Sequence, residues 1–366
     1  MLWGIIFLVG ILAFLLTFYF LAKKVSKFPF IEKLSKGNKN KSFLISILLI
    51  VVFLVITGLL TSAINAVIIA VHIILFWLIG DGINLLLRRK FKGSTVFLAS
   101  VSVLFIYLII AAVLCFHVSK KEYQLVTSKD VGSIRIVQFA DSHLGTTFDG
   151  EGLNEYVDMM NECQPDVVLI TGDFVDDASS YQDMVDGCKA LSRLETTYGV
   201  YYSFGNHDKG YSDHSARGFS GDDLIKELEK NGVIVLEDET VLIDDRFYII
   251  GRQDRSEETR SGSRSSMEEL TSEIDSSKYI VVMDHQPNDY DAQAKSNVDL
   301  VLSGHTHGGQ MLPINRIGEL IGANDYTYGL LHKDNTDFIV TSGISDWELL
   351  FKSGCNSEFV VIDINN

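Results

Sequence analysis

Two histidines separated by one residue, His305 and His307, stand in the stretch from Gly304 to Gln310. An apolar run from Val298 to Leu302 comes before them, and paired glycines after them allow the backbone to turn sharply. In an extended backbone, residues i and i+2 point to the same side, so both imidazoles can face one small volume. Neutral imidazole is the commonest protein ligand for transition metals. The pair therefore predicts a metal site, with a solvated histidine-rich loop as the alternative.

Four segments earlier in the chain also carry potential ligands, and each follows an apolar run with strand character. They are Asp141-Ser142-His143, Gly172-Asp173 with Asp176, Gly205-Asn206-His207-Asp208, and Asp284-His285. Any one of them could be structural, because Gly-Asp is a common turn and Asn can cap a helix. Five in order, each at a strand end, are typical of the sites that α/β sheets build at the carboxyl ends of their strands.

Short strands alternate with helices over residues 119–366. Apolar residues at helical spacing predict helices at 153–163 and 181–194, between strands at 133–140, 166–171 and 199–204, which gives βαβ units. Three further strands, at 233–236, 240–243 and 247–250, are expected to be antiparallel to one another, and four more are predicted at 278–283, 298–302, 338–341 and 359–364. The fold class is α/β (α+β), with two sheets face to face and helices on both outer faces, a four-layer αββα sandwich.

The first 118 residues have the composition of a membrane domain. They contain two acidic residues, Glu32 and Asp81, and long uncharged apolar runs of the length that crosses a bilayer as a helix. Four transmembrane helices are predicted before the domain at 119–366, at about 2–22, 43–61, 62–87 and 95–118.

Positive charge predicts the orientation of these spans. The loop after the first span carries seven lysines, and the loop after the third carries Arg88, Arg89, Lys90 and Lys92. Loops rich in Lys and Arg remain in the cytoplasm. The chain is thus expected to be a multi-pass protein of the cell membrane, with its second domain on the extracytoplasmic face.

The domain after residue 118 has a formal charge of −25, from 45 acidic and 20 basic residues. Nucleic acid is not an expected partner, because phosphate backbones are bound through clustered Lys and Arg. The four cysteines have no metal-type spacing and do not indicate a disulfide framework.

With these segments in order, the chain resembles the calcineurin-like metallophosphoesterases, whose pattern is Asp-x-His, Gly-Asp-x-x-Asp, Gly-Asn-His-Asp/Glu, His and Gly-His-x-His. The extended stretch from Gly304 to Gln310 is similar to the bacterial membrane-anchored branch. The resemblance implies one metal held by Asp141, His143, Asp173 and His307, and a second held by Asp173, Asn206, His285 and His305. It also implies that His207 and Asp208 are catalytic: His207 is expected to face the substrate, and Asp208 is expected to lie behind it, positioned to orient its ring.

The residue types suit such chemistry independently of the resemblance. A bridging carboxylate such as Asp173 can hold two divalent ions about 3.5–4 Å apart, where they clamp both oxygens of a phosphoryl transfer. Mixed oxygen and nitrogen ligands favour Mn, Fe, Zn or Co over Mg or Ca.

The sequence departs from the family pattern near its end, where a Trp, a Pro and an Arg usually follow the strand that corresponds to 338–341. Here the run from Ser345 to Cys355 has Trp347, places Lys352 near the position of the Arg, and has no Pro. Other basic residues could touch substrate phosphate or lie on a solvated surface: Lys209, His214, Arg217, Arg252 and Arg255.

The sequence therefore predicts a membrane-anchored, metal-dependent phosphoesterase that hydrolyses a phosphodiester or pyrophosphate bond in a small-molecule or lipid substrate, with a lipid-linked or cell-envelope compound as the natural candidate. An extracellular nucleotide phosphoesterase, a non-catalytic metal-binding membrane sensor and a permease are the alternatives. Intact ligand segments weigh against a sensor, and spans with few polar groups weigh against a permease.

Overall fold

The computed structural model describes residues 2–211, 217–260 and 262–366, without the side chains of residues 2–11 and 13. Contacts divide the chain into two compact units, Met1–Ile110 and Ala111–Asn366. Composition changes near residue 118, whereas the division of contacts falls before residue 111, because the last turns of helix α5 pack with the second unit.

The first unit is helical. Its helices are α1 (Leu2–Val25), α2 (Pro29–Leu34), α3 (Lys39–Leu60), α4 (Ala63–Leu86) and α5 (Gly93–Phe116), the last of which continues into the second unit. In the part of the chain that the structure describes, α3, α4 and α5 are long and apolar enough to cross a membrane. The first predicted span, 2–22, coincides with α1, but many of its side chains lie outside the described residues. Three spans are therefore found, and the fourth stays a prediction.

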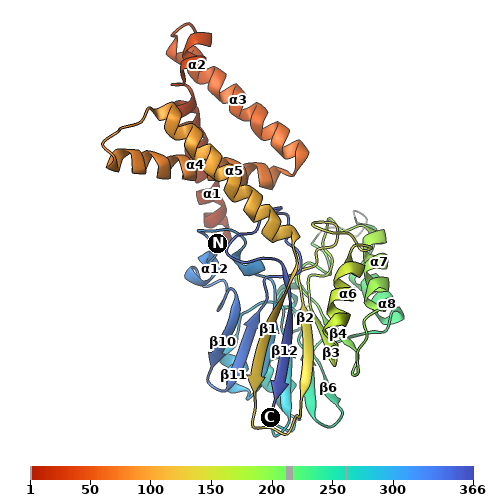
Figure 1. Ribbon diagram of the computed structural model, residues 1–366. Helices are drawn as coiled ribbons and strands as arrows, with labels where there is room; N and C mark the ends of the chain where they lie inside the picture. The colour runs from red at the N-terminus through yellow and green to blue at the C-terminus, as the bar shows by residue number, and fades with distance from the viewer. Residues whose placement is uncertain (1, 212–216, 261) are drawn as a thin grey trace. The chain divides into compact units, whose positions relative to one another are not determined.

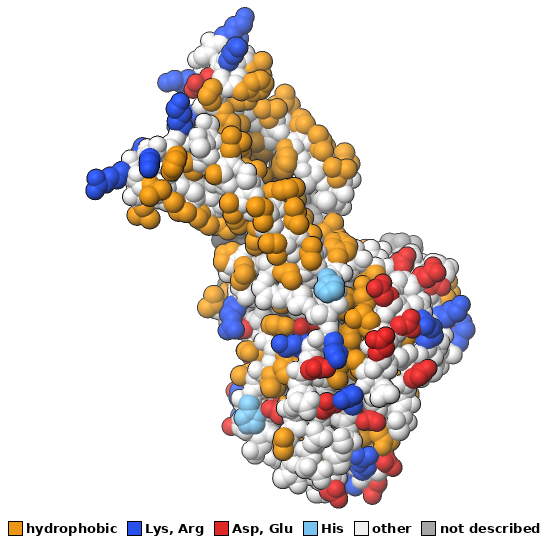
Figure 2. Space-filling view, viewed as in Figure 1, with side chains coloured by type: hydrophobic (Ala, Val, Ile, Leu, Met, Phe, Trp, Pro, Cys, Tyr) orange, Lys and Arg blue, Asp and Glu red, His pale blue; other side chains and the backbone are white. Residues whose placement is uncertain are grey.

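The side chains of α3 have the reverse of the arrangement in a water-soluble helix. Its buried residues include Ser42 and Ser46, whereas Leu44 and Leu48 are exposed. Figure 2 shows hydrophobic side chains covering the helices of this unit. Small polar residues inside and aliphatic residues outside are typical of helices that pack within lipid.

The ionisable groups within these helices have local partners. Lys24 of α1 pairs with Asp81 of α4, and the ring Nδ1 of His72 lies 2.8 Å from the carbonyl oxygen of Ile68. Asp81 and one ring nitrogen of His72 thus have polar partners among these helices, whereas Nε2 of His72 is buried without a hydrogen-bond partner in the described chain.

The second unit contains two six-stranded sheets (Figure 1). The first sheet has the order β1-β12-β2-β3-β4-β5, with β1 (Ser119–Val126), β12 (Glu358–Asn365), β2 (Ile134–Phe139), β3 (Val167–Thr171), β4 (Val200–Ser203) and β5 (Val233–Val235). The second has the order β10-β11-β9-β8-β7-β6, with β10 (Gly329–Lys333), β11 (Thr336–Val340), β9 (Leu300–Ser303), β8 (Tyr279–Met283), β7 (Phe247–Gly251) and β6 (Glu239–Ile243).

Alternate residues of the central strands face two different cores, as the pleat requires. In β2, Val137 and Phe139 belong to the core that contains residues of α6 (Leu153–Glu162), α7 (Tyr181–Leu191) and α8 (Gly221–Lys230), whereas Ile136 belongs to the core between the sheets. A third core packs the outer face of the second sheet against residues of α10 (Met267–Thr271) and α11 (Tyr290–Lys295). The predicted αββα sandwich is confirmed.

Three strands differ from the sequence-based expectation. β1 and β10 were not expected, because both lie at sheet edges and alternate with polar residues. The grouping of 233–236 with the next two strands is wrong, because β5 pairs in parallel with β4 and only β6 and β7 are antiparallel. Helix α8 is the reason, since a helical crossover returns the chain parallel to the strand before it.

The directions of the strands define the end of the first sheet at which β2, β3 and β4 have their carboxyl ends. We call this end of the strands the site edge; it is not an edge strand. β2, β3 and β4 are parallel and end there. Since β12 is antiparallel to β2 and β1 is parallel to β12, both β1 and β12 begin at the same edge. The chain therefore enters the sandwich from α5 at the site edge, and Val126 at the end of β1 lies at the opposite edge.

Candidate metal centre

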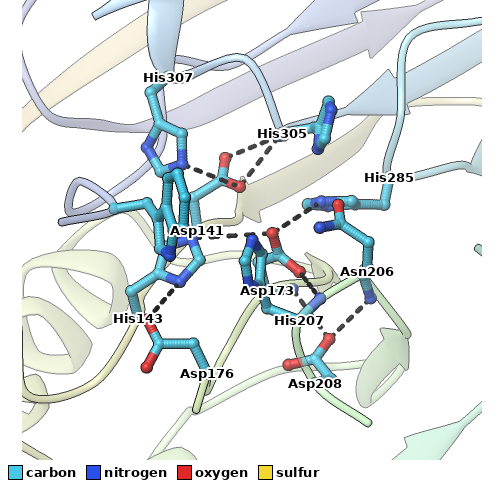
Figure 3. Close-up of polar contacts among 12 residues, drawn as sticks. Asp141, His143, Asp173, Asp176, Asn206, His207, Asp208, His285, His305 and His307 are labelled. Atoms are coloured by element: carbon cyan, nitrogen blue, oxygen red, sulfur yellow. Dashed lines mark hydrogen bonds and ion pairs between the residues drawn. The ribbon is translucent and has the colours of Figure 1, made fainter. Parts of the chain in front are cut away.

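The predicted ligands come from five loops that follow five strands. Asp141 and His143 follow β2, Asp173 follows β3, and Asn206 follows β4. His285 follows β8, and His305 and His307 follow β9 of the second sheet. Figure 3 shows their side chains directed into one shared volume. The strand ends of two packed sheets thus bring together residues up to 166 positions apart in the sequence.

Six of the seven predicted ligands form two groups, in each of which one potential ligand atom per residue lies within 4.8 Å of the others. The first group is Asp141, His143 and His307, and the second is Asp173, His285 and His305. Asp173 lies between the groups, because its Oδ2 is 3.0 Å from Nε2 of His285 and 3.7 Å from Nε2 of His143. One carboxylate therefore contacts ligands of both groups, as a shared ligand must.

Four of these residues have a buried polar atom without a hydrogen-bond partner in the described chain; one of the atoms, His307 Nδ1, lies toward Asp346, and the other three lie at the centre. These three atoms are Nε2 of His143, Nε2 of His285 and Oδ1 of Asn206. Buried polar atoms are normally hydrogen-bonded, and an exception calls for an explanation such as an ion. All three are potential metal-ligand atoms at the centre, so the residues present fit a metal site.

The other polar atom of each of these three side chains has an outer partner that fixes the orientation of the ligand. Metal-binding histidines normally use their second nitrogen in this way. The partners are Asp176 Oδ2 at 3.0 Å from His143 Nδ1, the Thr171 carbonyl at 2.8 Å from His285 Nδ1, and the Tyr211 hydroxyl at 2.7 Å from Asn206 Nδ2.

His305 and His307 are held in the neutral form that binds metals. Burial, together with the nearby His285 ring, lowers the pKa of His305 to about 4. Burial also lowers the pKa of His307 well below its ordinary value, with His143 and Lys352 contributing in the same direction. At neutral pH both rings therefore keep a lone pair for an ion.

The backbone at the centre is strained. Asp141, His143, Asp173, His305 and His307 all have positive φ, from 37° to 69°. Such a conformation costs of the order of 1–3 kcal/mol per residue outside glycine and clusters at functional sites. With this backbone conformation the chain turns directly after each strand, and the side chains point into the shared volume.

Glycines allow the approach of neighbouring loops to the two carboxylates. A Cβ at Gly205 would overlap the carboxylate of Asp173, and one at Gly304 would overlap that of Asp141. The His207 amide then donates to Asp173 Oδ1 at 2.8 Å, and the His305 amide lies 3.0 Å from both oxygens of Asp141.

His207 borders the centre without belonging to either ligand group. Its ring centroid is 5.2 Å from the His143 ring and 5.1 Å from the Trp347 ring. The ring lines a cavity of about 310 Å³ together with Asp173, His305 and Trp347. His207 therefore has access to a molecule held in this cavity.

The structure corrects the position predicted for Asp208. Its carboxylate is fully buried and accepts hydrogen bonds from the backbone amides of Asp173, Phe174, Val175 and Gly205, at 2.7–3.2 Å. It does not orient the ring of His207. Asp208 instead holds the loop that carries Asp173 against the loop that carries Asn206.

Replacing Asp208 with Asn is expected to destabilise the second unit by about 3 kcal/mol, because one amide oxygen cannot accept from four N–H groups and the new NH₂ would face donors. The midpoint of thermal unfolding should fall. Asp158→Asn is the control, since Asp158 forms an exposed ion pair with Arg193 that contributes little. If Asp208→Asn unfolded at the same temperature as the wild type but hydrolysed substrate more slowly, the role of orienting the His207 ring would be favoured instead.

Asp346 is a residue of the centre that the sequence did not identify. Its buried Oδ1 lies 3.4 Å from His307 Nδ1 and accepts a hydrogen bond from Gln310 at 2.9 Å. Burial raises the pKa of Asp346 to about 6 against the opposing effect of Lys352. The residue stands in the run where the chain departs from the family pattern, so that the pattern offered no position for it.

Most of the basic residues considered for substrate contact have structural roles. Lys352 is buried and donates to the carbonyls of Ser342 and Ser345. Lys209 pairs with Glu237, Arg217 donates to backbone carbonyls of Phe219 and Asp208, and Arg252 pairs with Asp284 and Asp289. Arg255 is exposed, and His214 lies outside the described residues. The structure therefore does not support contact with substrate phosphate by Lys352, Lys209, Arg217 or Arg252.

Comparison with known proteins gives a family for this geometry. The family model described as calcineurin-like phosphoesterase matches residues 134–309, which include all seven predicted ligands. A Helicobacter pylori protein named an uncharacterized metallophosphoesterase is 28% identical over 66% of this chain and 62% of its own length. A Campylobacter jejuni protein of the same description is 28% identical over 77% of this chain and 71% of its own length.

A relative from Danio rerio, named a transmembrane protein with metallophosphoesterase domain, is 26% identical over 64% of this chain and 54% of its own length. The chain thus spans about half to seven tenths of these relatives. Apolar helices long enough to cross a membrane accompany the domain in this chain. Over residues 134–309 the chain thus carries a calcineurin-like metallophosphoesterase domain.

Proposed function

We propose that this protein hydrolyses a phosphodiester or pyrophosphate bond at a centre of two divalent ions. Asp141, His143 and His307 would hold one ion and Asn206, His285 and His305 the other, with Asp173 shared. The observation that carries the proposal is the contact of Asp173 Oδ2 with a histidine of each group. Two ions so held would supply positive charge to both the attacking and the leaving oxygens of a phosphoryl group.

The chain's own residues then have separate tasks. Asp176 and Tyr211 keep His143 and Asn206 in their ligand orientations through hydrogen bonds of 3.0 and 2.7 Å. Among the described residues of its loop, His207 is the only ring that lines the cavity, and it is not itself a predicted ligand. It would donate a proton to the leaving oxygen, a contribution of about 10²–10⁴-fold when that oxygen needs one.

A lipid-linked or cell-envelope compound is the proposed substrate. The membrane helices confine the domain near the bilayer, and the cavity is lined by Ile314, Ile317 and Trp347 beside the metal ligands. A phosphate with an apolar substituent therefore suits the cavity better than a small, fully polar ester.

The direct test uses the full-length protein in detergent with Mn added, and offers phosphomonoesters, phosphodiesters and nucleotide-linked lipids. We expect metal-dependent turnover of diesters or pyrophosphates, with the lipid compounds as the better substrates. Turnover of monoesters alone would contradict the proposed bond. Bound metal without any turnover would favour a metal-binding sensor.

Topology is a separate prediction. The loop from Lys23 to Lys41 and the loop from Arg88 to Lys92 are proposed to be cytoplasmic, with the catalytic domain outside. A membrane-impermeant lysine reagent applied to whole cells should label the domain after Lys120 and spare the first loop. Labelling of the first loop alone would reverse the orientation and would transfer the substrate to the cytosol.

A further inference from the structure

Exposed aliphatic side chains are concentrated in one segment of the second unit, Met311–Ile321, which we call the apolar loop. In the described chain after residue 118, twelve large hydrophobic residues are exposed, and five of them fall within these eleven residues: Leu312, Ile314, Ile317, Leu320 and Ile321. Single exposed apolar residues are ordinary, but a cluster of them marks an interaction surface.

The apolar loop presents these residues in two directions. Ile314 and Ile317 line the cavity beside the metal ligands, together with Trp347. Leu320, on the same helical turn α12 (Ile317–Leu320), does not line the cavity and is 85% exposed. One surface of the loop is thus a wall of the cavity, and Leu320 belongs to an exposed apolar surface of the loop.

The apolar loop lies next to the point where the chain arrives from its last candidate membrane span. Ser353 donates its amide to the Gln310 carbonyl at 2.8 Å, and its hydroxyl accepts from the Leu312 amide at 2.9 Å. The adjacent Lys352 donates its amide to the carbonyl of Ala111, in the last turns of α5, at 2.9 Å. One short segment is therefore bonded to both the loop and the end of the span, within the second unit.

The charge of the loop suits contact with a bilayer. Its sequence contains one basic and one acidic residue, Arg316 and Glu319, whose charged groups lie 3.5 Å apart. The loop is thus neutral, although the domain around it is strongly acidic. Trp347 at its border is 39% exposed, and Trp is enriched where proteins meet the surface of a membrane.

We propose that the apolar loop inserts into the surface of the lipid bilayer and thereby opens the metal cavity to the lipid phase. The inference rests on the proposed function, in which the cleaved phosphate carries a lipid portion. The phosphate lies at the metal ligands, and Ile314 and Ile317 contact the first carbons of the lipid portion. A helix that already anchors the chain keeps the loop at a high effective concentration near the bilayer, so modest apolar contact suffices.

Depth-dependent quenching tests the insertion without any need for activity. The fluorophore NBD is attached at Leu320→Cys in the full-length protein, in a Cys163→Ser background because Cys163 is the one native cysteine that is not buried. The matched control is Val126→Cys, since Val126 is 86% exposed and lies at the edge opposite the site edge. The proteins are reconstituted in phosphatidylcholine vesicles with and without brominated acyl chains.

Brominated lipid is expected to quench the probe at position 320 by at least twofold and to leave the probe at position 126 unchanged. Equal emission of the two probes, with no quenching at 320, would overturn the proposal. So would a blue shift at 320 that bromine does not quench and that grows with the protein-to-lipid ratio, because a second copy of the chain would then cover the loop.

An activity measurement separates this inference from the proposed function. The variant Leu320→Asp/Ile321→Asp should lose roughly tenfold in turnover of a phosphodiester embedded in the vesicles, because charged groups insert poorly into apolar surroundings. Its turnover of water-soluble bis(p-nitrophenyl) phosphate should stay at the wild-type value, since neither residue lines the cavity. Equal turnover of the embedded ester by variant and wild type would count against insertion. If wild type cleaved neither ester, the proposed function would fail while the quenching result still decided the insertion.

Discussion

Asp173→Asn is expected to lose most of the bound metal and nearly all turnover. The substitution keeps the shape of the side chain and removes the charge that faces His143 and His285, one histidine from each ligand group. Changing an outer partner of a metal ligand typically costs about 10–100-fold in affinity or activity, so the shared ligand should cost more, roughly 10³-fold or above. Metal content per chain, measured beside the rate on a diester, tests both expectations.

Two comparison variants give this result its meaning. His143→Gln removes a ligand of one group and should be milder than Asp173→Asn. Asp186→Asn changes a half-buried carboxylate of α7, which is not a predicted ligand and accepts one hydrogen bond from Gln182, and it should leave metal content and rate unchanged. Full activity of Asp173→Asn in metal-free buffer would remove the two-metal mechanism altogether.

The layers of the fold and the gathering of the candidate ligands at strand ends could be predicted from the sequence because both depend on local patterns, whereas the division of the ligands into two groups was implied only by the family resemblance. Alternating apolar residues in 134–139 give a strand with two buried faces, and the parallel strands that follow end at the same edge. Any polar residue directly after such a strand is therefore brought to that edge. β9 belongs to the second sheet, yet the loop that follows it also reaches this place: the His305 amide lies 3.0 Å from the Asp141 carboxylate, 164 positions earlier in the sequence.

The roles of Asp208 and Asp346 could not be predicted, because each depends on contacts between distant loops. Asp208 follows His207 directly, which suggested a partnership, but successive side chains diverge and its carboxylate finds amides of the loop at 173–175. Asp346 reaches His307 only because the segment that precedes β12 folds across the site edge. Edge strands such as β1 escape detection for a related reason, since one side of them has no neighbour that demands apolar residues.

The strained backbone connects the fold to the chemistry. Five of the predicted ligands adopt positive φ where the strands end, and the cost is sustained because glycines and buried carboxylates fix the loops around them. The hydrogen bonds that Asp208 accepts from backbone amides accordingly hold the loops of the predicted metal site in place, although Asp208 contacts no predicted ligand atom. If Asp208→Asn binds less metal, we therefore expect its second unit to be less stable as well.

His207→Gln should separate catalysis from metal binding. The His207 ring lines the cavity and belongs to neither ligand group, so the variant should keep its metals. A general acid is worth about 10²–10⁴-fold only where the leaving oxygen needs a proton. The variant is therefore expected to lose little rate on a diester with a good aryl leaving group and much more on a diester with an alkoxide or sugar leaving group.

Tyr211→Phe is the matched control for this comparison, because Tyr211 also borders the His207 ring, at 5.1 Å between centroids, but acts on Asn206 through its hydroxyl. Loss of the Tyr211 hydroxyl should weaken Asn206 as a metal ligand and lower the rates on both diesters by the same modest factor. If His207→Gln also lowers both rates equally while retaining its metals, His207 stabilises charge on the phosphoryl oxygens and is not the acid. If His207→Gln lost metal, His207 would instead be a metal ligand and would belong to one of the two ligand groups that share Asp173.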